Sequence, residues 1–584
     1  MSRLDNTLGH LAPGVGSCRD LGGRYNPRRG LAIYCLPVPG YTPASPGMVL
    51  GEALAARSGL GCTLLEGIPE KVPEGAVVIA QYSALKAMRP DLLEEVPEMV
   101  EQGQYAVKLG RSALVTSSSR EGLASGMQTL AMLILRHTED YLPGCVISDA
   151  PFCQHRGLAV ELDSNEINAN LLMQIASFAA TFKCNRLHLI LNGDFDPARE
   201  IPGIDTFNQA CQSYGMGLGV RLRLLDGILS GRRTIIESWA AVRAAARAFG
   251  ATQAAMDDAC PGEDADDEAI RRVVQSVADG EVGVQNFSLD ANLILRAGVS
   301  PSELRTCGAS GWYRYWEDDE PPSDEMRDIP LSIDVQAPVM GFSARTAHGF
   351  LHRLDAAMGY LGRQHRRDLL VSFRDIGISH MWQNLLYPAA TGLIAAWGRP
   401  KGAEEAALRY SNLLYGDSAR EVMGVWDALS DAFPPGLSDT HERLVRRTAF
   451  GDWPESAEAG AVLRGIDWAE VAEGIKSSAD LFRSVASGLT RNAATLVGAK
   501  LGLFALSWLH CFIALTPELD RRRREKFDAD GRTETIAGEL YNNFLNWQNN
   551  LKELQNDSGL EFSETAKIEA MGLRLKGLCE GIFE

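Results

Sequence analysis

The sequence predicts an α/β protein with three consecutive regions: a small α+β domain at residues 1–150, a (β/α)8 TIM barrel at residues 151–400, and a helical C-terminal region at residues 401–584. Short apolar strands alternate with longer helical patterns from about Arg156 onward, which indicates a parallel sheet with crossover helices. The strand signal fades beyond about Lys401. A chain of 584 residues is also too long for one ordinary core, so two or three domains are expected.

Strand and helix patterns are mixed in residues 1–150. The segments "AVVIAQYSAL" and "QYAVKLGRSALVTSSS" are typical of strands, while "REGLASGMQTLAMLILRHT" has helical periodicity. A small sheet covered by helices fits this pattern. Ser117, Ser118 and Ser119 precede the helix, and we expect them to cap it rather than to act in catalysis.

The clearest strand–helix–strand unit is "HRGLAVELDSNEINANLLMQIASFAATFKCNRLHLILNGDF". Its first strand carries Leu158, Val160 and Leu162, and Asp163 or Ser164 offers a side-chain oxygen for a helix start. The helix is expected to bury residues spaced by four, four, three and four positions, namely Ile167, Leu171, Ile175, Phe178 and Phe182. The segment "RLHLIL" is the second strand.

Six further strands are predicted at "GLGVRLRLL", "ATQAAMD", "VGVQNF", "LSIDVQ", "LLVSFRD" and "TGLIAAW". The eight strands favour a closed parallel barrel, because each right-handed crossover buries one helix face and closure removes the sheet edges. Counts of seven or nine strands are the alternatives. The stretch "GASGWYRYWEDDEPPSDEMRD" is read as a long loop between the fifth and sixth strands.

Composition excludes several classes of protein. Hydrophobic residues make up 45% and charged residues 23% of the chain, as in packed domains and unlike disordered chains. The net charge of −18 repels polyanions, so no nucleic acid and no membrane surface is expected as a partner. The basic run Arg521 to Arg524 is read as a solvated helix end or loop.

The cysteines and the apolar runs of the sequence predict where in the cell the protein lies and whether it holds a cofactor. Eleven cysteines without CxxC pairs or metal-type Cys/His spacing suggest free thiols in a reducing compartment, so a cytoplasmic location without metal or other cofactors is expected. The start "MSRLDNTLGHLAPGVG" lacks a signal pattern, and no apolar run is long enough to span a membrane. The C-terminal helices either cover the side of the barrel or form a homodimer.

Polar residues mark the carboxyl ends of the predicted strands, where barrel active sites lie. They are Asp163, Asn192, Asp194, Arg223, Asp226, Asp257, Asp258, Asn286, Asp334, Gln336, Arg374 and Asp375, with Trp397 at the end of the last strand. Acids and amides bind sugar hydroxyls, and aromatic rings stack on sugar faces, so Trp312, Tyr313, Tyr315 and Trp316 could form such a surface. The alternative is that these acids and amides cap helices and solvate loops.

The adjacent pair Asp257 and Asp258 is the best candidate for acid catalysis. Two neighbouring carboxylates raise each other's pKa, which keeps one of them protonated near neutral pH. The surrounding "DDACPGEDADDE" is acidic throughout, so a solvated acidic loop is the alternative.

Several segments resemble glycoside hydrolase family 20, the β-N-acetylhexosaminidases. "DAPFCQHRGLAVELD" and "KCNRLHLIL" resemble the opening of that family's catalytic barrel, and "VKLGRSALVTSSSREGLASGMQTLAML" is similar to the end of its N-terminal α+β domain. "IDTFNQACQSYGMGLGVRLRLL" and "LLVSFRDIGISHMWQNLLYPAATGLIAAWG" resemble later parts of the barrel. The resemblance covers roughly residues 75–400.

The resemblance implies a retaining hydrolase in which the acetamido group of a β-linked N-acetylhexosamine attacks the anomeric carbon. Asp258 stands in the position of the family's acid Glu, Asp257 matches the Asp that orients the acetamido group, and Arg156 matches an arginine that binds sugar hydroxyls. The other expected pocket residues are Asp163, Asp194, Trp312, Asp375, His380, Trp382 and Trp397. For His380, Trp382 and Trp397 a packed core position is the alternative.

Two other functions remain open. The Asp-Asp pair in place of Asp-Glu suggests a non-catalytic relative that binds carbohydrate or serves as a scaffold, since fold alone does not prove activity. A glycosidase with two direct carboxylates would need a second acid facing Asp258, with Asp163, Asp194 and Asp334 as the candidates.

Overall fold

The computed structural model describes most of the N-terminal half of the chain and parts of the rest. The described residues are 8, 11–29, 32–36, 50–51, 53–55, 59, 61–136, 140–162, 167–192, 195–196, 200–224, 227–228, 231–256, 267–279, 287–290, 294, 296–300, 304, 310–315, 331–336, 344–364, 367–373, 382–398, 402–431, 467–486, 542, 545 and 549. They form two compact units. The first comprises Met1–Gln336, Arg353–Arg374 and Ala389–Arg409, and the second Ala337–His352, Asp375–Pro388 and Tyr410–Glu584.

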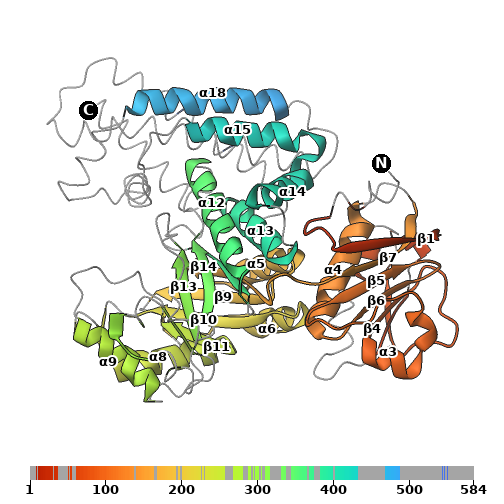
Figure 1. Cartoon of the computed structure of the whole chain (residues 1–584), viewed down its shortest axis with the longest axis horizontal. Coiled ribbons are helices and arrows are strands. Elements are labelled where there is room, and N and C mark those ends of the chain that lie inside the picture. Colours follow the sequence, from red (N-terminus) through yellow and green to blue (C-terminus); the bar gives the residue numbers. More distant parts are fainter. Residues whose placement is uncertain are drawn as a thin grey trace. The chain divides into compact units, whose positions relative to one another are not determined.

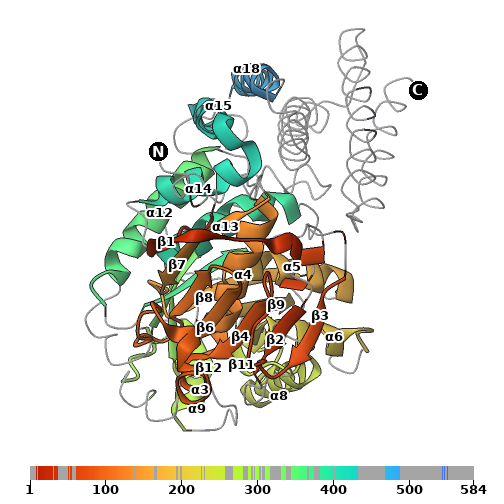
Figure 2. The ribbon, with the colours of Figure 1, turned by 90° about the vertical axis from the view of Figure 1, so that its right-hand side faces the viewer.

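The first unit begins with a seven-stranded mixed sheet in the order β1-β7-β5-β6-β4-β2-β3 (Figure 1). Its strands are β1 Ser17–Tyr25, β2 Ala32–Cys35, β3 Thr63–Glu66, β4 Val77–Gln81, β5 Tyr105–Leu109, β6 Ala113–Ser117 and β7 Leu142–Asp149. β5 is antiparallel to both neighbours and β1 is antiparallel to β7, while β2, β3, β4 and β6 run parallel. Figure 2 shows the molecule from the side on which this sheet lies. Short 3-10 turns lie at Pro27–Arg29 and Pro90–Leu93.

Helices cover both faces of this sheet. Helix α4 (Arg120–Arg136) buries Leu123 and Met127 in the same apolar cluster as Val77 and Ile79 of β4. The alternate β4 residues Val78 and Ala80 pack in a second cluster with Leu85 of α3 (Tyr82–Met88). A strand buried on both faces reads as a continuous apolar run, which explains the "AVVIA" signal.

The serine cluster before α4 caps that helix. The hydroxyl of Ser119 accepts a hydrogen bond of 3.1 Å from the backbone N–H of Gly122. One of the otherwise unbonded donors of the first turn is thereby satisfied. The predicted capping role is confirmed.

The remainder of the first unit contains a closed eight-stranded parallel barrel, as predicted. Its strands are β8 His155–Leu162, β9 Arg186–Asn192, β10 Gly217–Arg223, β11 Gln253–Met256, β12 Phe287–Asp290, β13 Ser310–Tyr315, β14 Leu331–Gln336 and β15 Asp368–Phe373. β15 pairs directly with β8 and closes the ring. The helices between and after the strands include α5 Ala169–Thr181, α6 Ile204–Ser213, α8 Ile235–Ala248, α9 Asp267–Ala278, α12 Ala344–Leu361 and α13 Trp382–Gly398.

The predicted number of barrel strands is right, but one of the eight predicted strands is wrong. "TGLIAAW" lies in α13, and "SGWYRY", predicted to be part of a loop, is strand β13. Residues 391–397 are all buried, and an apolar run of that length does not distinguish a buried strand from a buried helix. The predicted strand "VGVQNF" shares only Phe287 with β12, because residues 282–286 lie outside the described residues.

Helix α5 begins later than predicted. Asn168 is its N-cap and accepts a hydrogen bond of 2.9 Å from Leu171 N, whereas Asp163 and Ser164 lie outside the described residues. The helix buries Leu172, Ile175, Ala176, Ala179 and Ala180. Of the predicted core residues, Ile167, Ile175 and Phe182 are buried, whereas Leu171 and Phe178 are only half-buried. Small alanines complete the buried face of the helix, and the prediction considered only large side chains.

Beyond residue 401 the described secondary structure is helical. Helix α14 (Ala403–Tyr415) and a 3-10 turn at Gly416–Ser418 lead into α15 (Ala419–Asp431), which packs against α18 (Trp468–Ala486). Tyr415 and Phe482 meet edge to face with ring centroids 6.3 Å apart. Among the helices that the structure describes, none has both the length and the apolarity that a membrane crossing requires.

Candidate functional site

The inward face of the barrel follows from one contact between a helix and a strand. A Cβ atom on Gly392 of α13 would come within 2.3 Å of Cγ2 of Val371, so Val371 points outward at that helix. Because side chains alternate along a strand, Leu370 points inward. The ladder places Ala159 and Ile190 on the same face, and these two pack with Leu370 in a buried apolar cluster.

Above this cluster, toward the carboxyl ends of the strands, the interior is charged. Alternation and register place Glu161 of β8, Arg221 and Arg223 of β10, and Asp334 of β14 on the inward face. Nη1 of Arg223 donates to Oε1 of Glu161 at 2.8 Å. Nη1 of Arg221 lies 3.8 Å from Oδ2 of Asp334. Three of the four residues are buried; the side chain of Arg223 remains 22% exposed.

This arrangement is unusual for the centre of a barrel. Barrel interiors are generally filled by branched apolar side chains, and burying an ion pair has a desolvation cost that its attraction often fails to offset. The two pairs therefore add little to stability. They fix charged groups at the carboxyl end of the barrel, and the partly exposed side chain of Arg223 is accessible to a polar ligand there.

A histidine extends this polar interior toward the amino end. His188 of β9 is 9% exposed, and a Cβ atom on Gly219 of β10 would lie 2.3 Å from its Nδ1. Only glycine leaves room for the imidazole ring beside this strand. Asp334, expected at a strand end, is instead the fourth residue of β14 and fully buried.

Most of the predicted site residues cannot be placed. Asp163, Asp194, Asp257, Asp258, Asp375 and His380 lie outside the described residues, as do Asp226, Asn286 and Arg374. Trp312 is described as part of β13, in register with Ser332, and Trp382 as the first residue of α13; the placement of their side chains is not described.

Arg156 lies at the opposite end of the barrel from the expected pocket. It is the second residue of β8, and its guanidinium donates to the carbonyl oxygens of Cys153, Gln154 and Lys183. Its Nη2 forms a short ion pair with Glu121 of α4. The side chain is fully buried among these acceptors, so Arg156 is not placed to bind sugar hydroxyls and the prediction is corrected.

Trp397 is likewise at the amino end and belongs to the core. It is fully buried and joins the apolar cluster of the sheet. Its indole Nε1 donates to Oδ2 of Asp149 at 2.7 Å. The guanidinium carbon of Arg156 and Nζ of Lys183 lie 4.7 and 4.2 Å from the ring centroid. The core alternative for Trp397 therefore holds, and the tryptophan is a cation–π partner of two buried cations.

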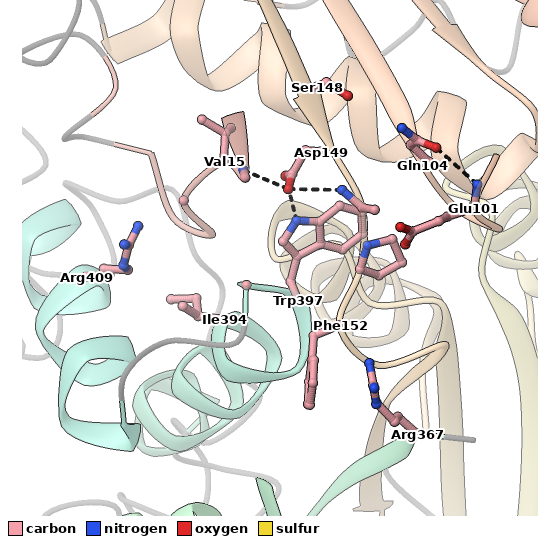
Figure 3. Close-up of a pocket in the computed structure, with 15 residues that line it drawn as sticks. Val15, Glu101, Gln104, Ser148, Asp149, Phe152, Arg367, Ile394, Trp397 and Arg409 are labelled. Carbon is pink, nitrogen blue, oxygen red and sulfur yellow. Dashed lines mark hydrogen bonds between the residues drawn. The ribbon is translucent and has the colours of Figure 1, made fainter. Parts of the chain in front are cut away.

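Asp149, the last residue of β7, is the centre of this amino-end network (Figure 3). Besides the indole, its Oδ2 accepts hydrogen bonds from Tyr105 Oη at 3.0 Å and Lys183 Nζ at 3.3 Å. Its Oδ1 accepts from the backbone nitrogens of Gly16 and Ala150 at 2.9 and 3.1 Å. Five groups of the protein donate to this carboxylate, from the sheet, the barrel and α13, which indicates a structural joint between the sheet and the barrel.

Burial shifts the titration of the groups in this joint. Desolvation lowers the pKa of Lys183 to about 8, and the carboxylate of Asp149 opposes the shift. Burial, and then the charge of Asp149, raise the pKa of Tyr105 well above its usual value. Lys183 also has a positive φ of 60°, which is uncommon for a residue other than glycine.

The sequence contains a signal for the charged interior that the prediction used only in part. In "LAVEL" and "VRLRL" the charged residues Glu161, Arg221 and Arg223 occupy the positions that alternate with apolar ones. A period of two therefore places them on the face away from the covering helices. For Lys183 and Asp149 no comparable pattern exists, because their partners come from distant parts of the chain.

No group of three or more His, Cys, Asp and Glu side chains within the described ranges could hold a metal ion. The seven described cysteines carry free thiols: Cys18, Cys35, Cys62, Cys145, Cys153, Cys184 and Cys211. Burial raises the pKa of most of them; for Cys35 it reaches about 12. Buried thiols with raised pKa values are poor nucleophiles.

Comparison with known proteins adds a sequence relative and structural neighbours. A stretch of 108 residues, 18% of this chain, is 28% identical to N,N'-diacetylchitobiase from Vibrio harveyi, of which it covers only 12%. The structure of beta-N-acetylhexosaminidase from Bacteroides fragilis NCTC 9343 matches with a TM-score of 0.52 at 11% identity, over 70% of this chain and 96% of that chain. The chain shares its fold. CpGH84D matches with a TM-score of 0.50 at 13% identity, over 88% and 92% of the two chains.

No protein-family model matches the sequence. At identities of 11% and 13% the structural likenesses establish the barrel fold and nothing more specific. The structural neighbours include a β-N-acetylhexosaminidase, as the sequence resemblance led us to expect.

Proposed function

We propose that the protein is a glycoside hydrolase that acts on β-linked N-acetylhexosamine, GlcNAc or GalNAc, or on a modified relative. The observation that carries this proposal is the charged interior at the carboxyl end of a closed barrel, built from Glu161, Arg223, Arg221 and Asp334. The partly exposed guanidinium of Arg223 suits a ligand rich in hydroxyl groups. Its position is the one at which barrel enzymes bind substrate.

In the proposed mechanism Asp258 is the general acid and base, and Asp257 orients the acetamido group. Both follow Met256, the last residue of β11, in the sequence. The acetamido oxygen of the substrate attacks the anomeric carbon while Asp258 protonates the departing oxygen. Water then opens the cyclic intermediate, with Asp258 as the base, and the product retains its configuration.

In this proposal Arg223, and not Arg156, binds the hydroxyl groups of the sugar. Leu222 is in register with Met256, so Arg223 lies at the same end of the barrel as the strand that leads into Asp257. Glu161 orients the guanidinium, and a guanidinium can donate to several acceptors at once. The other proposed pocket residues are Asp163, Asp194, Trp312, Asp375, His380 and Trp382.

The test is hydrolysis of 4-nitrophenyl β-N-acetylglucosaminide and β-N-acetylgalactosaminide by the full chain and by Asp258→Asn. We expect turnover by the wild type and a loss of about 100-fold or more in kcat for the variant. Asp205→Asn is the matched control, because Asp205 is an exposed carboxylate in the first turn of α6. Turnover that is indifferent to Asp258→Asn removes Asp258 from the mechanism.

A second substrate separates the acetamido mechanism from one with two carboxylates. The substrate-assisted reaction needs the 2-acetamido group, so 4-nitrophenyl β-glucoside should not be hydrolysed. Hydrolysis of that glucoside supports two direct carboxylates. Calorimetric binding of N-acetylglucosamine without turnover of any of these substrates supports the carbohydrate-binding scaffold instead.

We further propose that the protein is cytoplasmic and that its C-terminal helices either cover the side of the barrel or form a homodimer. The free thiols among the described residues support a reducing compartment. Cell fractionation tests the location, and sedimentation equilibrium of the full chain distinguishes a monomer from a dimer.

A further inference from the structure

A cavity of about 400 Å³ lies at the amino end of the barrel, beside the Asp149 joint (Figure 3). Its lining includes Phe152 and Arg367 from the segments just before β8 and β15, and Ile394 and Trp397 from the end of α13. The backbone holds these walls together, since Phe152 N donates to Trp397 O at 2.8 Å. The cavity shares no residue with the charged carboxyl-end interior.

Arg367 places a guanidinium in the wall of this cavity. Its guanidinium carbon lies 4.5 Å from the ring centroid of Phe152, and its Nε is buried without a hydrogen-bond partner. Within the described part of the chain no hydrogen bond or ion pair reaches this guanidinium. Arg156, by contrast, has four acceptors around it. A partly buried guanidinium without an anion is unfavourable, and an incoming carboxylate relieves that cost.

Two further side chains that carry N–H donors line the same cavity. Gln104 uses its Oε1 to accept from the backbone nitrogens of Val100 and Glu101, which leaves its amide N–H groups as donors. Arg409 donates to Glu405 through Nε and Nη2. Its Nη1 lies beside Gly14, only 1.7 Å from the position that a Cβ atom on this glycine would take.

The acidic side chains in the lining do not neutralise these donors. Asp149 is saturated by five donors of the protein and is buried. Glu101 is an exposed residue, so solvent screens its charge. Ile394, Pro151 and the ring of Phe152 supply apolar surface, which suits a flat hydrocarbon body.

We propose that this cavity binds a small organic carboxylate with a flat apolar body, whose carboxylate pairs with Arg367 and whose body packs against Phe152 and Ile394. The volume is within the range of small-molecule sites. A planar guanidinium matches the two oxygens of a carboxylate in geometry, and that of Arg367 lies over the ring of Phe152. The site is separate from the proposed sugar site.

The test is calorimetric titration of the full chain with benzoate. We expect saturable 1:1 binding at millimolar concentrations, weakened by about tenfold or more in Arg367→Gln because a charge-assisted pair is lost. Benzamide, which has the same shape without the charge, should bind about tenfold more weakly than benzoate. The matched control is Arg363→Gln, because Arg363 is exposed just after α12, and it should bind benzoate as the wild type does.

Further measurements separate the possible outcomes. Arg367→Lys retains the charge and should recover part of the affinity, and circular dichroism of each variant checks that the chain is folded. Phenyl phosphate and inorganic phosphate distinguish an organic carboxylate from a phosphate as the preferred ligand. Absence of benzoate binding, equal affinity in Arg367→Gln, or tighter binding of either phosphate overturns the proposal.

Discussion

The two ends of the barrel use arginines in different ways. At the amino end Arg156 is surrounded by carbonyl oxygens, a carboxylate and an indole ring, and none of its side chain is exposed. At the carboxyl end Arg223 pairs with Glu161 and keeps 22% of its side chain exposed. A saturated guanidinium holds domains together, whereas a partly exposed one can still recognise a ligand. The environment, rather than the residue type, decides between the two roles.

The largest effect is expected at the amino end. Arg156→Ala removes the partner of Glu121 and empties the space beside Trp397, so we expect the free energy of unfolding to fall by about 3–5 kcal/mol. Urea unfolding followed by tryptophan fluorescence measures it. An unchanged unfolding midpoint would contradict the structural role of Arg156.

At the carboxyl end we expect an effect on activity instead. Arg223→Gln should lower kcat/KM for the aryl N-acetylglucosaminide by about 10- to 100-fold, since a hydrogen bond to a charged donor is lost in the substrate complex. The double variant Glu161→Gln/Arg223→Gln is the control, because it avoids leaving the buried Glu161 carboxylate alone. If the double variant keeps wild-type kcat/KM, Arg223 does not contact the substrate.

The pH dependence of stability sharpens the comparison at the amino end. The pKa of Lys183 is about 8 in the folded chain, below the ordinary value of 10.5, so the unfolded chain binds more protons between these values. Lys183 therefore lowers the free energy of unfolding at pH 8 and below. As the pH rises from 8 to 10, this free energy should increase by about 1 kcal/mol per pH unit. Lys183→Met should abolish that rise in urea titrations; a rise of equal slope in the variant assigns it to another group.

The smallest effect is expected on the surface of the barrel. Arg271 and Glu268 of α9 form an exposed pair three residues apart, with side chains 59% and 62% exposed. Arg271→Gln should change the free energy of unfolding by less than about 0.5 kcal/mol and leave turnover unchanged. A larger loss of stability would mean that arginine ion pairs stabilise this barrel whether or not they are buried. The proposed difference between the arginines at its two ends would then have no basis in burial.

Periodicity was sufficient to predict most of the fold. The alternation around Leu158 and Val160 gave β8, and "LSIDVQ" matched β14 residue for residue. It failed at "TGLIAAW", because a buried helix and a buried strand both read as an apolar run. It also failed at "SGWYRY", because the aromatic residues of β13 are followed by acidic and proline-rich sequence typical of a loop.

The candidate site was harder to predict from the sequence than the fold. Resemblance pointed to Arg156 by motif, but a motif does not tell at which end of a strand its arginine is used. The pair of Glu161 and Arg223 bridges strands separated by β9, and only the closed sheet shows that their side chains meet. The network around Asp149 joins residues 105, 149, 183 and 397, which no local pattern connects.

Hydrogen–deuterium exchange with and without N-acetylglucosamine tests the contrast between the two ends most directly. If the sugar binds at the carboxyl end, exchange should slow in peptides that cover Val160–Leu162 and Leu222–Leu224, while peptides that cover Asp149–Arg156 and Ile394–Gly398 keep their rates. Protection confined to the amino-end peptides would contradict the account.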